Sequence, residues 1–347
     1  MKLLKNACWA AAFSLSFQAA HGAIPNIPEE EGWGAWVVLG VGYTDIESNT
    51  VAGNSLVDVG KDTITDINSG PDSDDDTHPL FTGQATYTFG NRYQAFVGSS
   101  ILDRLTLDFS QQIGVRKQLE DGQRVSVGIL YGAIPSEVWE DPYLTGTPRR
   151  ATDNESSGLR VEWDAILGTG ANIIVDWRER DIDVDTIGAS VAGCDADCQS
   201  SLQRDGDSIR VEGAWVYNLG NGHFLRPAIR YNEFDADGSA QERDSTAAQV
   251  TYSYMAKDYT LALTGAIGET SYDNVNPIYG EKQDADNLVI DATVFYNVSA
   301  DGKWQIFGNA GYGESDSDID FHDGEMTYAA IGVYYTFGNQ GTRWSNR

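Results

Sequence analysis

The sequence has few basic residues and little histidine. Lysine and arginine together number 23 against 52 aspartates and glutamates, which gives a formal net charge of −29. Nucleic acid is therefore disfavoured as a partner, because phosphate backbones are bound through a basic surface. A hydrolase built on serine and histidine needs the histidine on a rigid strand, whereas His78 and His322 fall in predicted loops and His223 falls at a predicted turn. The composition indicates no enzyme and no cofactor.

Long apolar runs are also missing. Beyond the first 22 residues no stretch approaches the roughly 20 apolar residues that a transmembrane helix needs. At the start, Lys2 and Lys5 precede a short apolar run that ends in small residues up to Gly22, which is typical of an export signal. We predict a cleaved signal peptide over 1–22 and one mature domain over 23–347. Loss of the two lysines makes the mature charge −31 (−29 − 2).

The mature chain instead alternates apolar and polar residues with a period of two. In the segment 208–219, Ile209 and Val211 alternate with Arg210 and Glu212. Successive side chains of a strand point to opposite faces, so such a strand has one apolar and one charged face. The pattern predicts about 14 strands. These are 33–46, 79–89, 92–99, 104–118, 122–136, 156–168, 171–183, 206–219, 222–234, 244–256, 258–270, 285–298, 303–315 and 325–337.

The connections between these strands alternate in length. Short turns rich in Gly, Asn and Asp, such as Gly220-Asn221-Gly222, alternate with longer polar loops such as 184–205. Outer-membrane barrels have short periplasmic turns and long extracellular loops. We therefore expect an all-β protein, a closed antiparallel transmembrane barrel of about 14 strands, or 12 if 92–99 and its following connection fail to form. A soluble β-sandwich would share the alternation but not the regular change in loop length.

The last predicted strand resembles the C-terminal signal by which outer-membrane barrels are passed to the barrel-insertion machinery. Its match consists of Gly332, Tyr335 and Phe337. Two departures are Ala330, where a polar residue is usual, and the ten residues that follow Phe337. This strand predicts the insertion machinery as a partner, together with the lipid and lipopolysaccharide of the outer membrane.

Several short strings point to a family. They are Gly53-Asn54-Ser55-Leu56 with Asp58-Val59-Gly60, Gly114-Val115-Arg116, Pro135 to Tyr143, and Ile166-Leu167-Gly168-Thr169-Gly170. They resemble a family of Gram-negative outer-membrane proteins that is known only as a domain of unknown function. The resemblance runs from about residue 30 to the C-terminus. It implies an outer-membrane barrel and supplies no activity and no catalytic residues.

Two cysteines, Cys194 and Cys198, remain after the predicted cleavage. In an exported chain, a pair this close in a loop indicates a disulfide. The alternative is a metal-binding pair, but zinc would need two further Cys or His ligands nearby.

Charged residues dominate the predicted inner face between residues 104 and 232. Alternation places there Arg104, Arg116, Arg124, Arg160, Glu162, Asp164, Asp176, Arg178, Arg180, Arg210, Glu212, Arg226 and Arg230. The later strands place mostly neutral side chains on the predicted lumen face, with Asp291 as the exception. Such a lopsided wall would orient polar or charged solutes in a water-filled pore. Alternatively, its Arg–carboxylate pairs would brace a filled lumen.

The long loops are acidic. The loop 47–78 holds eight acidic residues against Lys61 alone, and a second acidic group lies at 315–325. These oxygens could bind divalent cations that bridge to lipopolysaccharide, or form a solvated anionic surface. The loop 47–78 is also long enough to fold inward.

These features predict a porin-like channel for passive diffusion of small polar or charged solutes. The alternative is a non-conducting structural or adhesive surface barrel, and an outer-membrane hydrolase ranks third. The sequence does not indicate the solute or the oligomeric state.

Overall fold

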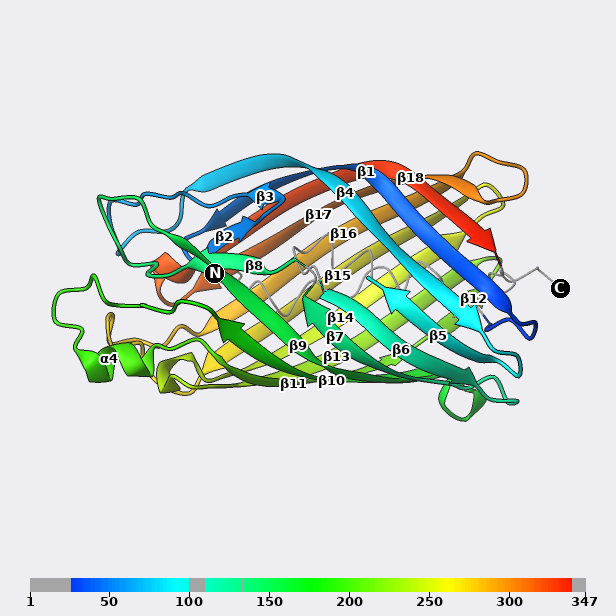
Figure 1. Ribbon diagram of the computed structural model, residues 1–347, viewed down its shortest axis with the longest axis horizontal. Coiled ribbons are helices and arrows are strands. Elements are labelled where there is room, and N and C mark those ends of the chain that lie inside the picture. Colours follow the sequence, from blue (N-terminus) through cyan, green and yellow to red (C-terminus); the bar gives the residue numbers. More distant parts are fainter. Residues whose placement is uncertain (1–25, 100–109, 133, 339–347) are drawn as a thin grey trace.

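A computed structural model describes residues 26–99, 110–132 and 134–338. They form a closed antiparallel barrel of 14 strands, as predicted (Figure 1). The wall consists of β1 (Gly32–Ser48), β4 (Ser73–Thr88), β5 (Tyr93–Gly98), β6 (Ser110–Gln118), β7 (Arg124–Gly132), β9 (Ala151–Asp164), β10 (Ala171–Ile182), β11 (Gly206–Trp215) continued by β12 (Tyr217–Gly220), β13 (His223–Ala236), β14 (Arg243–Met255), β15 (Tyr259–Tyr272), β16 (Ala285–Asn297), β17 (Trp304–Ser317) and β18 (Gly324–Gly338).

The two faces of the wall separate as the alternation predicts. In β9 the apolar side chains of Leu159, Val161 and Trp163 are exposed on the outside, while Arg160 and Glu162 are buried on the inside. A protein folded around an apolar core shows the opposite arrangement. The outer face therefore suits lipid and the inner face suits polar contents.

The register of the barrel is continuous around its circumference. Hydrogen-bonded partners can be followed once around, and the row returns to β1 sixteen residues further along (48 − 32 = 16). The row is Gly32, Thr88, Gln94, Arg116, Ser126, Glu162, Ile174, Glu212, Arg230, Ala247, Gly268, Asn287, Ser315, Gly324 and Ser48. This stagger over 14 strands corresponds to a strand tilt of roughly 40° and a backbone diameter of about 28 Å.

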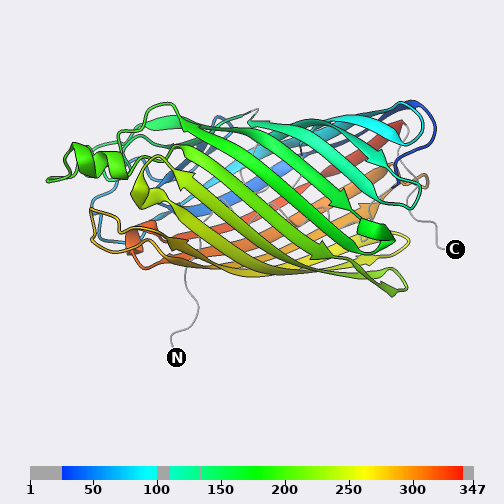
Figure 2. The ribbon, with the colours of Figure 1, turned by 90° about the horizontal axis from the view of Figure 1, so that it is seen from below.

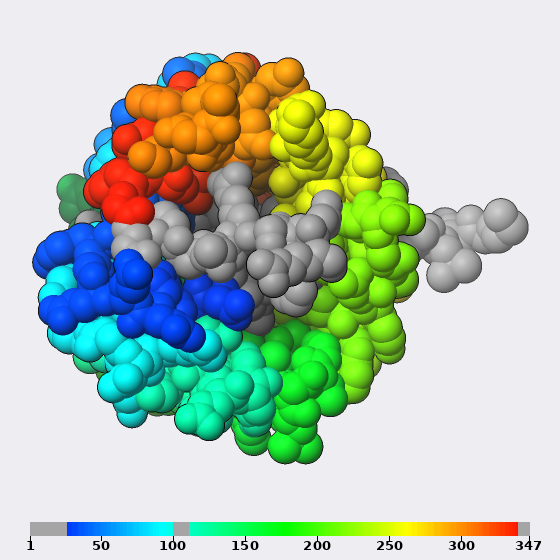
Figure 3. Space-filling view, turned by 90° about the vertical axis from the view of Figure 1, so that its right-hand side faces the viewer, coloured from blue at the N-terminus to red at the C-terminus, as the bar shows by residue number. Residues whose placement is uncertain are grey.

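The two ends of the barrel differ. Tight turns, the start of β1 and the end of β18 lie at one end, which we name the turn end, and long loops lie at the other, the loop end (Figures 1 and 2). At the turn end, Asn221 and Gly222 both have positive φ (53° and 83°), as a two-residue hairpin turn requires. Seen from the turn end, the strands follow one another around the barrel in sequence order (Figure 3).

The structure corrects several predicted boundaries. β4 begins at Ser73 rather than at residue 79, because the acidic run before His78 pairs with β1. His78 therefore lies in a strand rather than in a loop, and its ring faces Gly42. β7 ends at Gly132, β9 begins at Ala151, and the predicted strand 104–118 is described only from Ser110.

Three short strands were not predicted. β2 (Val51–Asn54) and β3 (Val57–Asp58) form a hairpin in the loop after β1, and β2 also pairs with β8 (Ser136–Trp139), which continues along β9. Val57 and Val59 are fully buried in a cluster with Val38 of β1 and Leu80 of β4. Since Val38 and Leu80 face inward, this loop folds into the barrel.

Within the described residues, helical structure is confined to short pieces. These are α4 (Ala196–Ser201) and the 3₁₀ turns η1 (Ile166–Gly168), η2 (Ser239–Gln241) and η3 (Asp320–His322). Within the described ranges, no helix is both long enough and apolar enough to cross a membrane.

Candidate functional site

One group of ion pairs on the lumen wall centres on Asp176 of β10. Arg160 of β9 donates from Nε and Nη2 to its two carboxylate oxygens, at 2.7 and 2.9 Å. Arg210 of β11 donates to the same carboxylate, and Arg178 Nη2 lies 4.0 Å from it. Asp176 is 1% exposed. Bidentate Arg–carboxylate geometry is both strong and directional, so this group fixes three neighbouring strands.

A second group lies beside it on β11 and β13. Arg226 donates to Glu212 Oε1, and Arg230 Nε lies 3.7 Å from Glu212 Oε2. Towards the turn end, Arg124 of β7 donates to Asp164 of β9 at 2.7 and 3.0 Å. The pairs Arg230–Glu212 and Arg124–Asp164 bridge directly opposed positions on adjacent strands, whereas Arg226 lies four residues along β13 from the position opposite Glu212 (230 − 226 = 4).

Two further arginines contact side-chain amides and aromatic rings. Arg116 Nε donates to Gln94 at 2.7 Å, and its guanidinium lies 5.1 Å from the Phe96 ring. Arg180 Nε donates to Asn154 at 2.9 Å. Because neutral partners leave the positive charge uncompensated, these two residues add to the cationic character of the wall.

All predicted lumen residues that the structure describes lie on the inner face, while Arg104 lies outside the described residues. Among the described residues, eight arginines and four carboxylates make a net charge of +4 (8 − 4) on this wall. The arginines are Arg116, Arg124, Arg160, Arg178, Arg180, Arg210, Arg226 and Arg230, and the carboxylates are Glu162, Asp164, Asp176 and Glu212. A chain with a net charge of −29 therefore presents a positive arc inside.

The wall opposite is mostly neutral. Asp291 of β16 accepts hydrogen bonds from Thr293 (3.2 Å), Asn309 of β17 (2.6 Å) and Tyr328 of β18 (2.9 Å). Thr251 and Thr264 share a hydrogen bond of 3.0 Å on β14 and β15. This arc carries the mostly neutral groups expected of the later strands, with Asp291 as the charged exception.

An aromatic cluster on the same arc was not predicted. Phe295 of β16 lies 5.3 Å from Phe307 of β17 and 5.5 Å from Tyr334 of β18, and Tyr334 stacks on Trp36 of β1 at 5.8 Å. These rings alternate with outward apolar neighbours such as Val294 and Ile306, so both faces of the strands are apolar here. Alternation carries no signal in such a segment, which is why the cluster was missed.

Some buried polar atoms of the inner face have no hydrogen-bond partner. Arg226 Nη1, Ser126 Oγ, Gln112 Nε2 and Asn309 Oδ1 are in this state. Buried donors and acceptors are normally satisfied, and an unsatisfied one is expensive. Such atoms are suited to water or to a bound solute.

The loops at the loop end pack together into one apolar cluster, which we name the cap. Six connections around the rim contribute to it: β1–β4, β8–β9, β10–β11, β13–β14, β15–β16 and β17–β18. Its buried residues are Ile64, Tyr143, Ile187, Leu202, Ala240, Ile319 and Phe321. Because these loops start from all sides of the barrel, the cap lies across the loop end.

Tyr143 lies at the centre of the cap. Its ring is 4.9 Å from Phe321. Its hydroxyl lies 3.1 Å from His322 Nε2 and accepts a hydrogen bond of 3.1 Å from Asn276, which also donates to Gln283 at 2.9 Å. Burial is the main cause that raises the pKa of Tyr143 above its usual range. The hydroxyl therefore stays protonated and joins three loops.

Charged side chains tie the cap to the strand ends. Arg149 donates to the carbonyls of Asn49 (2.7 Å), Pro142 (3.1 Å) and Lys61. Burial lowers the pKa of Arg149 to about 10, so it remains charged at neutral pH. Arg204 holds Asp185 through two hydrogen bonds of 2.7 and 3.2 Å. The contacts of Arg149 with Asn49 and Lys61 join segments 100 and 88 residues apart in sequence.

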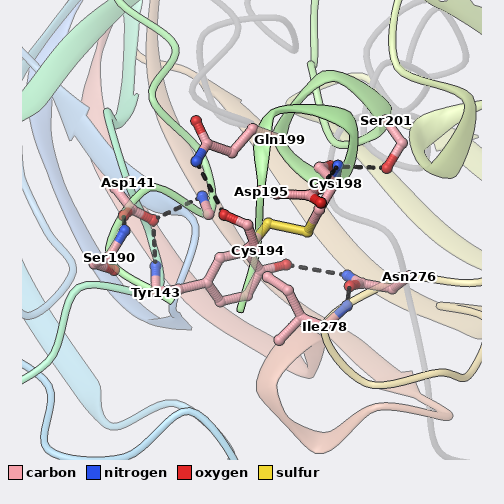
Figure 4. The surroundings of a disulfide bond; sticks show 11 residues. Asp141, Tyr143, Ser190, Cys194, Asp195, Cys198, Gln199, Ser201, Asn276 and Ile278 are labelled. Carbon is pink, nitrogen blue, oxygen red and sulfur yellow. Dashed lines mark hydrogen bonds between the residues drawn. A yellow bond between two sulfur atoms is a disulfide. The ribbon is translucent and has the colours of Figure 1, made fainter. Parts of the chain in front are cut away.

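The predicted disulfide between Cys194 and Cys198 is confirmed. It joins the start of α4 to the preceding turn, and both cysteines pack against the cap (Figure 4). Asp195 caps α4 by accepting from the Cys198 backbone N–H at 3.1 Å. Nearby, Asp141 accepts from the backbone N–H groups of Gly188 and Ser190 and orders the segment before the disulfide (Figure 4).

His322 should make the cap sensitive to acid. Burial lowers the pKa of His322 to about 3, below the value near 6.5 of an unfolded histidine. Between these two values the unfolded segment binds a proton that the folded segment does not, so cap stability falls as pH drops from about 6.5 towards 3, by up to about 1.4 kcal/mol per pH unit. Limited proteolysis of the loops between pH 7 and 4 measures this loss.

The matched control is His322→Gln, which keeps a hydrogen-bonding side chain without the titration. Carboxylates are common to both proteins, so their contribution cancels in the comparison. Equal pH dependence in the two proteins would show that His322 is not the titrating group.

The acidic loops do not assemble a metal site among the residues described. There, no three His, Cys, Asp or Glu side chains gather in a way that could hold a metal ion. Lys61 pairs with Asp74 at 2.7 Å, and Asp66 accepts from Asn68. The divalent-cation partner remains a prediction.

The predicted insertion signal lies at the closing seam between β18 and β1. Gly332 faces Gly40 so closely that a Cβ would meet Leu39 O at 2.5 Å. Tyr335 lies 4.2 Å from the ring of Trp304, on the outside of the barrel, and Phe337 follows it. The glycine is explained by the close approach of the strands, and the role in insertion remains a prediction.

A family model described as a protein of unknown function (DUF2860) matches residues 32–336. No curated protein matches the sequence.

Several solved structures are similar to this chain. An anion-selective porin from Comamonas acidovorans has a TM-score of 0.40 and 9% identity, covering 89% of this chain and 99% of that one. A Pseudomonas aeruginosa FadL homologue has a TM-score of 0.43 and 11% identity, covering 96% of this chain and 98% of that one. A TodX monoaromatic hydrocarbon channel mutant has a TM-score of 0.46 and 10% identity, covering 90% of this chain and 91% of that one. With identities of 9–11% and TM-scores of 0.40–0.46, these likenesses assign no function to this chain.

Proposed function

This chain belongs to the DUF2860 family of proteins of unknown function, and from its inner face we propose that it is an outer-membrane channel for passive diffusion of small polar or charged solutes. The observation that carries the proposal is the charge asymmetry of the lumen. One arc carries eight arginines against four carboxylates, and the opposite arc carries hydroxyls, amides and Asp291. Lumen charges of this kind set the selectivity of channels.

The dimensions of the barrel support the same proposal. A wall of 14 strands encloses an interior wider than side chains alone usually fill, although inserted loops can narrow it. The β2–β3 hairpin and the cap narrow the loop end. We infer that the turn end faces the periplasm and the loop end faces the outside, and that solutes enter when the cap loosens.

Conductance of the refolded mature barrel in a planar bilayer tests the proposal. We expect discrete channels that favour anions, because the lumen has excess positive charge. The triple variant Arg160→Ala/Arg178→Ala/Arg210→Ala should shift the reversal potential towards cations. Arg150→Ala is the matched control. It removes a positive charge from an exposed loop, away from the lumen.

A non-conducting structural or adhesive barrel is the second candidate. It is favoured by the packed cap and by the pairing of Arg160, Arg210 and Arg226 with carboxylates, which would brace a filled interior. A folded, inserted barrel that never conducts, even with a loosened cap, would establish this candidate over the channel.

A hydrolase ranks below both. Two of the described histidines bond to tyrosines, His223 to Tyr252 at 2.6 Å and His322 to Tyr143 at 3.1 Å. These pairs do not form the serine–histidine arrangement that hydrolysis requires.

A further inference from the structure

Two arginines of the inner face meet at one aromatic ring near the loop end. The guanidinium of Arg243, on β14, lies 4.4 Å from the centroid of the Phe234 ring, and the guanidinium of Arg180, on β10, lies 5.9 Å from it. Arg243 also lies 5.5 Å from the ring centroid of Tyr272 on β15. A guanidinium within about 6 Å of a ring centroid is attracted by the ring. Phe234 therefore holds two positive charges near each other.

The strand register explains why both side chains reach the same ring. Phe234 is directly opposite Arg243 on the neighbouring strand. On the other side, β11 lies between Arg180 and Phe234, and its inner face there carries Gly206 and Ser208. Since neither has a large side chain, Arg180 can extend across β11 to the ring.

Neither arginine is neutralised by a carboxylate. Arg180 Nε donates to the amide oxygen of Asn154 at 2.9 Å. Arg243 Nη1 donates to the carbonyl oxygen of Gln241 at 2.8 Å. Among the described residues, no carboxylate lies within ion-pair distance of either guanidinium, whereas the arginines nearer the turn end pair with carboxylates.

The charges around Arg180 add to a positive sum. Its charged neighbours are Arg243, Arg204 and Asp185, so the group of four carries +2 (3 − 1). This level lies beyond the apolar outer band, because the outward neighbour Glu179 is charged and exposed. Removal from bulk water lowers the pKa of Arg180 to about 10, and repulsion by Arg243 and Arg204 adds to this effect. The group therefore stays charged at neutral pH and attracts anions.

Both guanidiniums keep donors that reach solvent. Arg180 and Arg243 are partly exposed, unlike Arg226 and Arg230, which are 7% and 3% exposed. Among the described residues, both Nη groups of Arg180 and the Nε and Nη2 groups of Arg243 have no hydrogen-bond acceptor, and these nitrogens are not buried. Each set forms one edge of a guanidinium, which matches two oxygens of a carboxylate or a phosphate.

We propose that Arg180 and Arg243 form a binding site for small doubly charged oxyanions at the loop end of the lumen. One oxyanion accepts hydrogen bonds from both guanidiniums, and Phe234 sets their separation. A singly charged carboxylate leaves one guanidinium uncompensated, and a cation is repelled by both. The inference rests on the proposed channel function and names its solute class.

Isothermal titration of the folded, detergent-solubilised mature barrel tests the site. The probes are succinate, inorganic phosphate and acetate at about pH 8, where the first two are mainly doubly charged. We expect one succinate or one phosphate per barrel to bind at least about tenfold more tightly than acetate, because the second guanidinium adds a charge-assisted hydrogen bond. The tighter of the two dianions shows whether the site takes a dicarboxylate or a compact oxyanion.

Variants then assign the contacts. Arg180→Gln and Arg243→Gln should each weaken dianion binding by about tenfold or more and change acetate binding by no more than about twofold. Arg150→Gln removes an equal charge from an exposed loop. It is the matched control and should change neither. Resistance of the barrel to unfolding in SDS checks that each variant is folded.

The ring is tested by Phe234→Leu. Leucine keeps an apolar side chain but removes the attraction of the ring for both guanidiniums. The preference for dianions over acetate should therefore fall, while each arginine still binds acetate. Equal weakening of all three anions would show that Phe234 supports the fold and does not position the arginines.

The outcomes separate the site from the channel. Acetate binding as tight as that of both dianions would overturn the site. So would dianion binding that a folded Arg180→Gln or Arg243→Gln protein retains in full. Conductance of the same preparation reports the channel independently: conduction without dianion preference removes only the site, and dianion binding without conduction removes only the channel.

Discussion

Replacement of Tyr143 with alanine is expected to open the cap and to give the largest rise in conductance of any single change. Tyr143 is 2% exposed, packs on Phe321 at 4.9 Å and bonds to Asn276 and His322. Truncation of a buried aromatic side chain costs about 3–5 kcal/mol. The cap residues lie in loops beyond the strand ends, so this loss should fall on the cap rather than on the wall.

Single-channel recording and limited proteolysis of the loops measure the effect together. Tyr143→Phe is the control, because it keeps the ring contacts and loses only the hydrogen bonds, at about 1 kcal/mol. We expect the open probability and the rate of loop cleavage to be highest in Tyr143→Ala, intermediate in Tyr143→Phe and lowest in the wild-type protein. Unchanged loop protection in Tyr143→Ala would mean that the cap does not depend on this residue.

Replacement of Asp176 with asparagine is expected to destabilise the barrel most among changes to the wall. It leaves the guanidiniums of Arg160 and Arg210 without the carboxylate that each contacts. Removal of one partner from a buried ion pair costs about 3–5 kcal/mol, because the remaining charge is uncompensated. The same change raises the positive charge of the lumen, so the channel should become more anion-selective.

Urea unfolding of the barrel in lipid vesicles gives the stability, and the reversal potential gives the selectivity. Asp183→Asn, on an exposed loop, removes the same charge without an ion pair and should alter neither by a measurable amount. A stable Asp176→Asn barrel with unchanged selectivity would show that water already compensates the arginines.

The sequence was sufficient to predict the wall of the barrel. Alternation in β9–β11 assigned Arg160, Asp176 and Arg210 to the inner face, because their neighbours such as Val161 and Val175 are apolar and lie outside. Turn residues such as Asn221-Gly222 located the hairpins. Both signals are local, and a sheet with one face in lipid repeats them along every strand.

Features that depend on distant residues were not predictable. The aromatic cluster lies in strands that are apolar on both faces, so the period-two pattern does not distinguish Phe295 from Val294. The cap contains Ile64 and Phe321, whose loops have no periodicity and meet only in three dimensions. The hairpin of β2 and β3 was missed because its pairing with β8 joins Val51 to Val138, far along the chain.

The composition of the cap has a consequence for the order of assembly. Its residues come from connections around the whole rim, including Ile64 after the first strand and Phe321 before the last. While β1 and β18 are apart, the sheet is open and its ends hold these residues away from each other, so the cluster cannot form before the seam does. Only closed barrels should therefore have protease-resistant loops. A chain that stalls before closure remains susceptible to proteolytic degradation.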